Sequence, residues 1–94
     1  MPKAILNGSV IAESESTEPV EGTHYFPPES DNKDHLKPSD THSVCPWKGT
    51  ASYYSVSANG HESVDAAWYY PDAKDAAKRF EGYVAFWKDV KVED

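Results

Sequence analysis

The sequence predicts a mainly β domain, built from several small coiled antiparallel sheets or hairpins with one α-helix in the C-terminal half. Two Asn-Gly pairs, Asn7-Gly8 and Asn59-Gly60, each lie between runs of residues that favour strands. Because both residues of such a pair tolerate positive φ, Asn-Gly is a strong indication of a β-hairpin. The helix depends on a separate observation, which is an apolar stripe at helical spacing after Pro71.

The first half of the chain contains two short strand regions and one long polar connection. Residues 3–13 predict a first hairpin around Asn7-Gly8, and residues 19–26 predict a strand, or a turn followed by a strand. From residue 27 to residue 41 the chain is polar and rich in proline. We expect a long loop there, with one short helical turn near residues 30–36, and loops of more than ~12–15 residues are usually functional or mobile.

The second half combines more strands with the predicted helix. Strands are expected at residues 49–57, 63–70, 83–87 and 90–92. The apolar stripe of the helix, at positions i, i+3, i+4 and i+7, consists of Ala73, Ala76, Ala77 and Phe80. Asp72 is suited to the N-cap position and Gly82 to the position after the helix, so we predict an α-helix between these two residues.

Length and charge restrict the class of protein. The chain has 94 residues, 9 Lys and Arg against 16 Asp and Glu, and a net charge of −7. This length favours a single domain over residues 1–94. The acidic charge disfavours nucleic acid as a partner, and no apolar run reaches the ~20 residues of a membrane span. With one cysteine and no signal-like start, a cytoplasmic location is expected.

Aromatic residues are numerous and lie on both arms of the second predicted hairpin. The chain has 3 Trp, 6 Tyr and 3 Phe, and the hairpin carries Tyr53-Tyr54 on one arm and Trp68-Tyr69-Tyr70 on the other. Since alternate side chains of a strand point to opposite faces, these aromatic residues cannot all share one core. We therefore expect a second subunit or a flat ligand to cover one face.

His24 is distinguished from the other histidines by its aromatic neighbours. It precedes Tyr25 and Phe26 in a predicted strand, so Phe26 shares its face and Tyr25 points to the other. A neutral imidazole beside aromatic walls can ligate a haem iron, whereas an isolated histidine more often has a structural role. His42 and Cys45 have the spacing H-x-x-C, but no second pair of ligands completes a zinc site.

The segment Cys45-Pro46-Trp47-Lys48-Gly49 permits two interpretations. In an enzyme, Cys45 would be the nucleophile, Lys48 would lower its pKa and His42 would act as base. In a structural corner, Pro46 fixes a turn and Trp47 fills the core, and the usual burial of cysteine favours this second interpretation. No glycine-rich phosphate loop precedes a helix, so the residues do not support nucleotidyl transfer.

Four motifs together resemble the DUF427 family over nearly the entire chain. They are Tyr25–Pro28, Cys45–Tyr54, Ala67–Pro71 and Gly82–Trp87. The match is closest to the short, single-domain members of oxygenic phototrophs. The resemblance implies a compact assembly of small coiled antiparallel sheets, similar to the Mss4-like architecture. It also implies haem binding, iron-related regulation and a dimer that shares haem through histidines.

The leading hypothesis is a non-enzymatic protein that binds haem b and regulates a partner protein. Two copies would form a homodimer in which each contributes His24 as an axial ligand, because two-fold symmetry lets one residue fill both positions. The candidate haem contacts are His24, Tyr25, Phe26, Trp47, Tyr54 and Trp68. The candidate metal ligands are His24 and His42, and His24 is preferred because a strand holds a ligand more rigidly than a loop.

Two further hypotheses remain open. A small enzyme or small-molecule-binding domain would use a cleft around Cys45, Pro46, Trp47, Lys48 and Tyr54. A protein-interaction module would instead dock a partner on its aromatic face.

Overall fold

The computed structural model describes residues 1–94 and is mainly β, as predicted. It contains nine strands and three short 3₁₀ helices. A three-stranded sheet has the order β2-β1-β9, with bounds Ser9–Glu13, Lys3–Leu6 and Lys91–Glu93. A two-stranded sheet pairs β3 (Glu18–Val20) with β4 (Thr23–Tyr25). A four-stranded sheet has the order β5-β6-β7-β8, with bounds Leu36–Cys45, Gly49–Ala58, His61–Tyr69 and Val84–Phe86.

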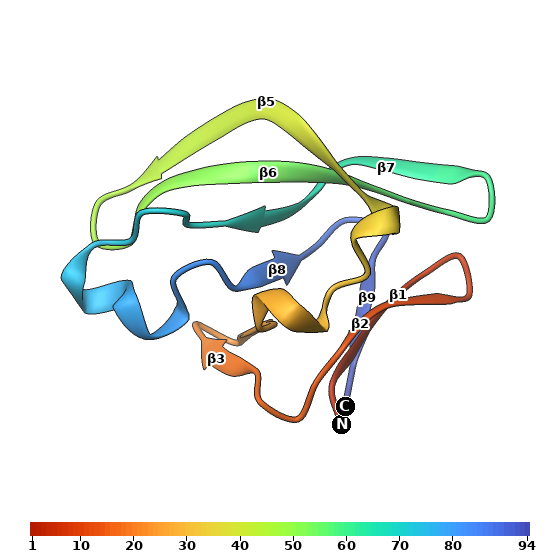
Figure 1. Ribbon diagram of the computed structural model, residues 1–94, viewed down its shortest axis with the longest axis horizontal. Helices are drawn as coiled ribbons and strands as arrows, with labels where there is room; N and C mark the ends of the chain where they lie inside the picture. The colour runs from red at the N-terminus through yellow and green to blue at the C-terminus, as the bar shows by residue number, and fades with distance from the viewer.

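The three sheets are antiparallel throughout and are arranged around the long strands β6 and β7. Figure 1 shows β5, β6 and β7 crossing the upper part of the molecule, with β8 below them and the β1-β2-β9 sheet to one side. The pairing of Lys3 with Glu93 brings β1 and β9 together. The two ends of the chain therefore lie side by side (Figure 1).

Both Asn-Gly hairpins are confirmed. Asn7 and Asn59 have positive φ values of 49° and 51°, and a glycine with positive φ follows each of them. The tips of the two hairpins contact one another, because the Asn59 side-chain amide donates to the Asn7 carbonyl oxygen at 2.9 Å. The region predicted as a strand, or a turn followed by a strand, is a third hairpin whose turn is Glu21-Gly22.

The predicted α-helix after Pro71 is replaced by a 3₁₀ helix of six residues, η3, at Asp75–Phe80. Backbone groups that would begin a longer helix bond elsewhere, since the Ala73 amide donates to Glu81 Oε2 and the Lys74 amide to the Lys48 carbonyl oxygen. With three residues per turn, positions 77 and 80 share a face. Ala77 and Phe80 are accordingly buried, whereas the residue at position 76 is exposed.

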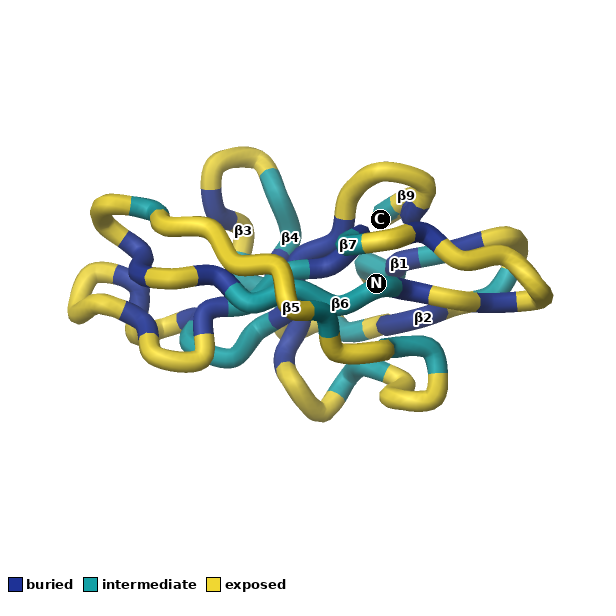
Figure 2. The backbone as a smooth tube through the Cα atoms, turned by 90° about the horizontal axis from the view of Figure 1, so that it is seen from above, coloured by how far each residue is buried: buried dark blue, intermediate teal, exposed yellow.

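The predicted loop of residues 27–41 contains more regular structure than expected. Two 3₁₀ turns, η1 (Pro28–Ser30) and η2 (Lys33–His35), are followed directly by β5. The sequence does not indicate β5 because this strand lies at the sheet edge and is largely exposed (Figure 2), so its side chains do not alternate between apolar and polar.

The chain covers both faces of the four-stranded sheet with its own residues. One buried cluster, which includes Val56 and Phe86, takes Tyr54 and Tyr69 from the second hairpin. The other, which includes Phe80, takes Tyr53, Trp68 and Tyr70. The prediction that these aromatic residues do not share one core is confirmed. The chain builds a cluster on each face, so the aromatic count does not by itself require a second subunit or a ligand. Figure 2 shows buried backbone in the middle of the molecule and exposed loops around it.

Gly49 begins β6 in a conformation that other residues rarely adopt. Its φ is +120°, and a Cβ added there would lie 3.1 Å from the Asp72 carbonyl oxygen. We expect Gly49→Ala to lower the free energy of unfolding by about 1–3 kcal/mol, measured by urea denaturation. Gly8→Ala is the control, since its φ is +83° but nothing lies within 4 Å. Equal losses in the two variants would show that the close approach at Gly49 has no effect.

Candidate functional site

The structure has two cavities that bear on function, one beside His24 and one beside Lys48. The first is a groove of about 260 Å³ between the β3–β4 hairpin and the C-terminal segment. Its lining consists of Gly22, Thr23, His24, Phe86, Val90 and Val92. One imidazole therefore faces a wall that includes a phenyl ring and two valine side chains.

Two neighbouring oxygens hold the His24 ring. Nδ1 lies 2.8 Å from Thr17 Oγ1, and Nε2 lies 3.1 Å from Asp94 Oδ1. With Asp94 in place, Nε2 donates to its carboxylate and Nδ1 accepts from the Thr17 hydroxyl. When Asp94 moves away, the other tautomer lets Nδ1 donate to Thr17 Oγ1 and gives Nε2 a free lone pair. The residue that faces Nε2 is highly exposed, since the Asp94 side chain keeps 82% of its accessible surface. A ligand that competes for Nε2 therefore has only an exposed carboxylate to displace.

Tyr25 and Phe26 point to opposite sides, as the strand alternation predicts. Tyr25 belongs to the cluster around Phe80, whereas Phe26 belongs to the other cluster. The Phe26 ring centroid lies 5.7 Å from that of Phe86, which lines the groove. Phe26 therefore supports the groove from behind, and of the predicted haem contacts only His24 lines it directly.

Tyr54 was predicted as a haem contact and does not line the groove, whereas two residues of the C-terminal segment line it without having been predicted. Tyr54 stacks on Tyr69 with centroids 4.8 Å apart and lines neither cavity. Val90 and Val92 were not predicted as contacts, although residues 90–92 were predicted as a strand. No local pattern indicates that this strand approaches His24, because the approach depends on the pairing of β9 with β1.

His42 lies on β5, away from the His24 groove. Its Nδ1 is 3.4 Å from the Ala51 carbonyl oxygen and 3.4 Å from Ser52 Oγ. The structure does not place His42 in the lining of either cavity, so the two candidate metal ligands do not share a site. No group of three or more His, Cys, Asp or Glu side chains is arranged to hold a metal ion.

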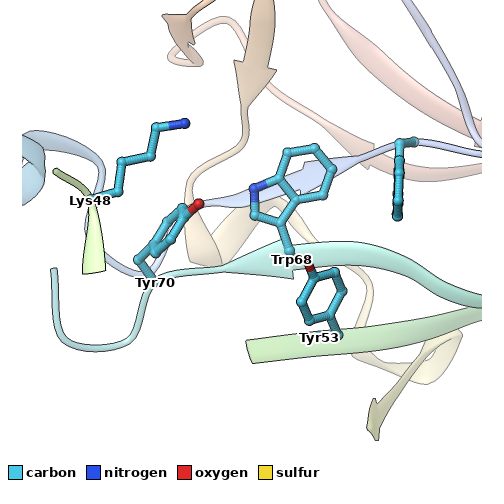
Figure 3. Close-up of a pocket in the computed structure, with 5 residues that line it drawn as sticks. Lys48, Tyr53, Trp68 and Tyr70 are labelled. Atoms are coloured by element: carbon cyan, nitrogen blue, oxygen red, sulfur yellow. The ribbon is translucent and has the colours of Figure 1, made fainter. Parts of the chain in front are cut away.

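The second cavity, of about 210 Å³, has one cation among aromatic rings. Its lining consists of Lys48, Tyr53, Trp68, Tyr70 and Trp87. Figure 3 shows Lys48 and Tyr70 on one side, with Trp68 and Tyr53 extending the aromatic wall. We call this cavity the Lys48 pocket.

Lys48 is an almost fully buried cation with a carboxylate partner. Its side chain keeps 10% of its accessible surface, and Nζ donates to Glu21 Oε1 at 2.5 Å and to Tyr25 Oη at 3.5 Å. The same tyrosine oxygen accepts a hydrogen bond from Trp68 Nε1 at 3.2 Å. Nζ also lies 5.2 Å from the centre of the Trp47 ring. The β3–β4 turn thus contacts Lys48 through Glu21.

The electrostatics of the Lys48 pocket keep its groups protonated. Burial lowers the pKa of Lys48, but the hydrogen bond to Glu21 and the nearby Tyr25 and Tyr70 more than offset this, so the pKa is raised overall. Burial raises the pKa of Tyr70 to about 12. The pocket therefore presents a fixed ammonium and a neutral phenol at neutral pH.

The cleft predicted around Cys45, Pro46, Trp47, Lys48 and Tyr54 is not one cavity. Of these residues only Lys48 lines the pocket, and Tyr54 belongs to the cluster on the opposite sheet face. Trp47 is 37% exposed, so it does not fill the core as expected. Its ring instead packs edge-on against Phe80, with centroids 6.1 Å apart.

None of the helices is long and apolar enough to cross a membrane.

Comparison with known proteins identifies the family. No curated protein matches the chain. The model of the family NTP_transf_9, described as a domain of unknown function (DUF427), matches residues 3–94. The chain therefore belongs to the DUF427 family.

Proposed function

We propose that this protein binds haem b through His24 and acts as a small non-enzymatic regulator or carrier. The observation that carries the proposal is the position of the imidazole. Thr17 fixes Nδ1 while only an exposed carboxylate of Asp94 faces Nε2. Metal-binding histidines commonly use one ring nitrogen in this way to orient the other. Phe86, Val90 and Val92 supply the apolar surface that a porphyrin requires.

The size of the groove supports a shared site. Its volume of about 260 Å³ is below the range of ~300–1,000 Å³ that is typical of pockets enclosing a whole ligand. One chain would therefore cover only part of a haem. A second copy related by two-fold symmetry would cover the rest and contribute its own His24, so the proposal includes a homodimer.

The broader features implied by the family resemblance belong to the same proposal. They are an Mss4-like arrangement of the sheets, a cytoplasmic location and a partner protein that the haem-bound dimer regulates. Haem would supply a redox-active iron. The residues of this chain would bind and orient it.

Titration with hemin tests the proposal. We expect wild-type protein to shift the Soret band and to form dimers on binding, whereas His24→Ala should lose at least ~10-fold in affinity. Thr17→Val should weaken binding by ~10–100-fold, because the imidazole loses the group that orients it. Absorption spectra and analytical ultracentrifugation measure the two effects.

Two other histidine variants serve as controls. His61→Ala removes an exposed imidazole that pairs with Asp89, and it should leave the Soret band unchanged. His42→Ala tests the second candidate ligand directly. An unaltered spectrum in His24→Ala, or loss of the Soret shift in His42→Ala alone, would remove His24 from the proposed role.

A further inference from the structure

We infer that the Lys48 pocket is a second binding site, for a small molecule with one aromatic ring and a carboxylate. The inference is independent of haem, because the pocket and the His24 groove share no lining residue. It depends on three features of the pocket: a buried cation, an exchangeable counter-ion and exposed but fixed aromatic walls.

The cation makes the pocket suited to an anion. Lys48 has one ion-pair partner, Glu21, whose side chain keeps 62% of its accessible surface and lies on the β3–β4 turn. A carboxylate from a ligand can take the place of Glu21 beside Nζ, because the exchange preserves the charge pair. Glu21 then returns to water at small cost, because its own side chain is already 62% exposed and the carboxylate of the ligand replaces it beside Lys48.

The walls make the pocket suited to a flat ring. Trp68 and Trp87 both line the pocket and meet nearly at right angles, with centroids 5.9 Å apart. Such an edge-to-face pair can add a further ring in the same geometry. Trp87 is 47% exposed, yet its Nε1 donates to the Asp65 carbonyl oxygen at 2.6 Å. The indole is therefore held in place while its surface stays open, as expected for a preformed platform.

Volume and charge exclude other ligand classes. At about 210 Å³ the pocket could enclose a single-ring ligand but not a whole nucleotide or porphyrin, since pockets that enclose larger ligands begin at ~300 Å³. Aromatic walls often bind quaternary ammonium groups. Here Lys48 already lies over the rings of Tyr25 and Tyr70 and would repel a second cation.

Benzoate, benzamide and benzyltrimethylammonium are matched probes for this site. We expect benzoate to shift the indole N–H resonances of Trp68 and Trp87 in a ¹H–¹⁵N NMR titration of haem-free protein. Benzamide, which keeps the ring and a carbonyl acceptor but loses the charge, should bind at least ~10-fold more weakly, because it cannot replace the Glu21 carboxylate as the counter-ion of Lys48. Stronger binding of benzyltrimethylammonium than of benzoate would overturn the inference.

Two variants change the binding in opposite directions. Lys48→Met should abolish the preference for benzoate over benzamide. Glu21→Gln should strengthen benzoate binding several-fold, because it removes the competing carboxylate and leaves Lys48 in place. Lys3→Met, which removes an exposed lysine that pairs with Glu13, is the control and should change nothing.

The outcomes separate this site from the haem site. His24→Ala should bind benzoate as the wild type does. If Lys48→Met fails to fold, Glu21→Gln still decides the matter, since unchanged or weaker benzoate binding in that variant would contradict the exchange of carboxylates.

Discussion

Replacing Asp31 by asparagine is expected to raise the free energy of unfolding at pH 8 by about 1–3 kcal/mol. The Asp31 side chain has 0% of its accessible surface, and Oδ2 lies 3.4 Å from Lys33 Nζ. Its other oxygen, Oδ1, is buried without a hydrogen-bond partner. Burial raises the pKa of Asp31 to about 7, against an opposing effect of Lys33. Asparagine removes the buried charge and keeps the shape.

The sign of the pH dependence follows from this raised pKa. Below pH ~4 the carboxyl is protonated in both states. As the pH rises towards 7, the unfolded chain releases this proton while the folded protein keeps it. The free energy of unfolding therefore falls over this interval. A folded pKa of about 7 against the usual 3.8 sets an upper limit of about 4 kcal/mol on the loss, at ~1.4 kcal/mol per unit. Above pH 7 the contribution of Asp31 is constant.

Urea denaturation of wild type and Asp31→Asn between pH 4 and pH 8 measures the effect. The difference between the two proteins isolates the effect of Asp31. Other carboxyl groups, such as Asp65 and Glu81, change stability with pH in the opposite direction, because hydrogen bonds lower their pKa values. Asp34→Asn changes the net charge equally at an exposed position nearby and should have little effect. A difference that does not vary with pH would contradict the assignment.

The parts of the fold that the sequence predicts are those that depend on neighbouring residues. The turns at Asn7 and Asn59 need only two residues with positive φ, so the composition of the turn is sufficient. The segment after Asp72 has every local feature of an α-helix. It forms a 3₁₀ helix because the Ala73 and Lys74 amides bond to groups distant in the fold.

The same distinction applies to the candidate sites. The aromatic neighbours of His24 are adjacent in sequence, so the alternation of Tyr25 and Phe26 was predictable. The Lys48 pocket was not, because Lys48 meets Glu21 across 27 positions and Trp68 meets Tyr25 across 43. The unusual composition around Lys48 was evident, but only the folded chain shows that the lysine, and not Cys45, faces a cavity.

Phe80→Ala is expected to lower the free energy of unfolding by about 3–5 kcal/mol, because the ring is fully buried and its removal leaves a cavity. Its centroid lies 4.9 Å from that of Tyr25 and 6.4 Å from that of Tyr70. Domains are typically stable by only ~0.05–0.15 kcal/mol per residue, so the loss is a large part of the total for a 94-residue chain. Urea denaturation followed by tryptophan fluorescence measures it.

Trp47→Ala is the matched control, since it deletes a larger ring that packs against the same Phe80 but is 37% exposed. If burial decides the cost, Trp47→Ala should destabilise the protein less than Phe80→Ala despite the larger deletion. The reverse order would mean that the buried cluster around Phe80 depends on the Cys45–Gly49 corner more than on η3.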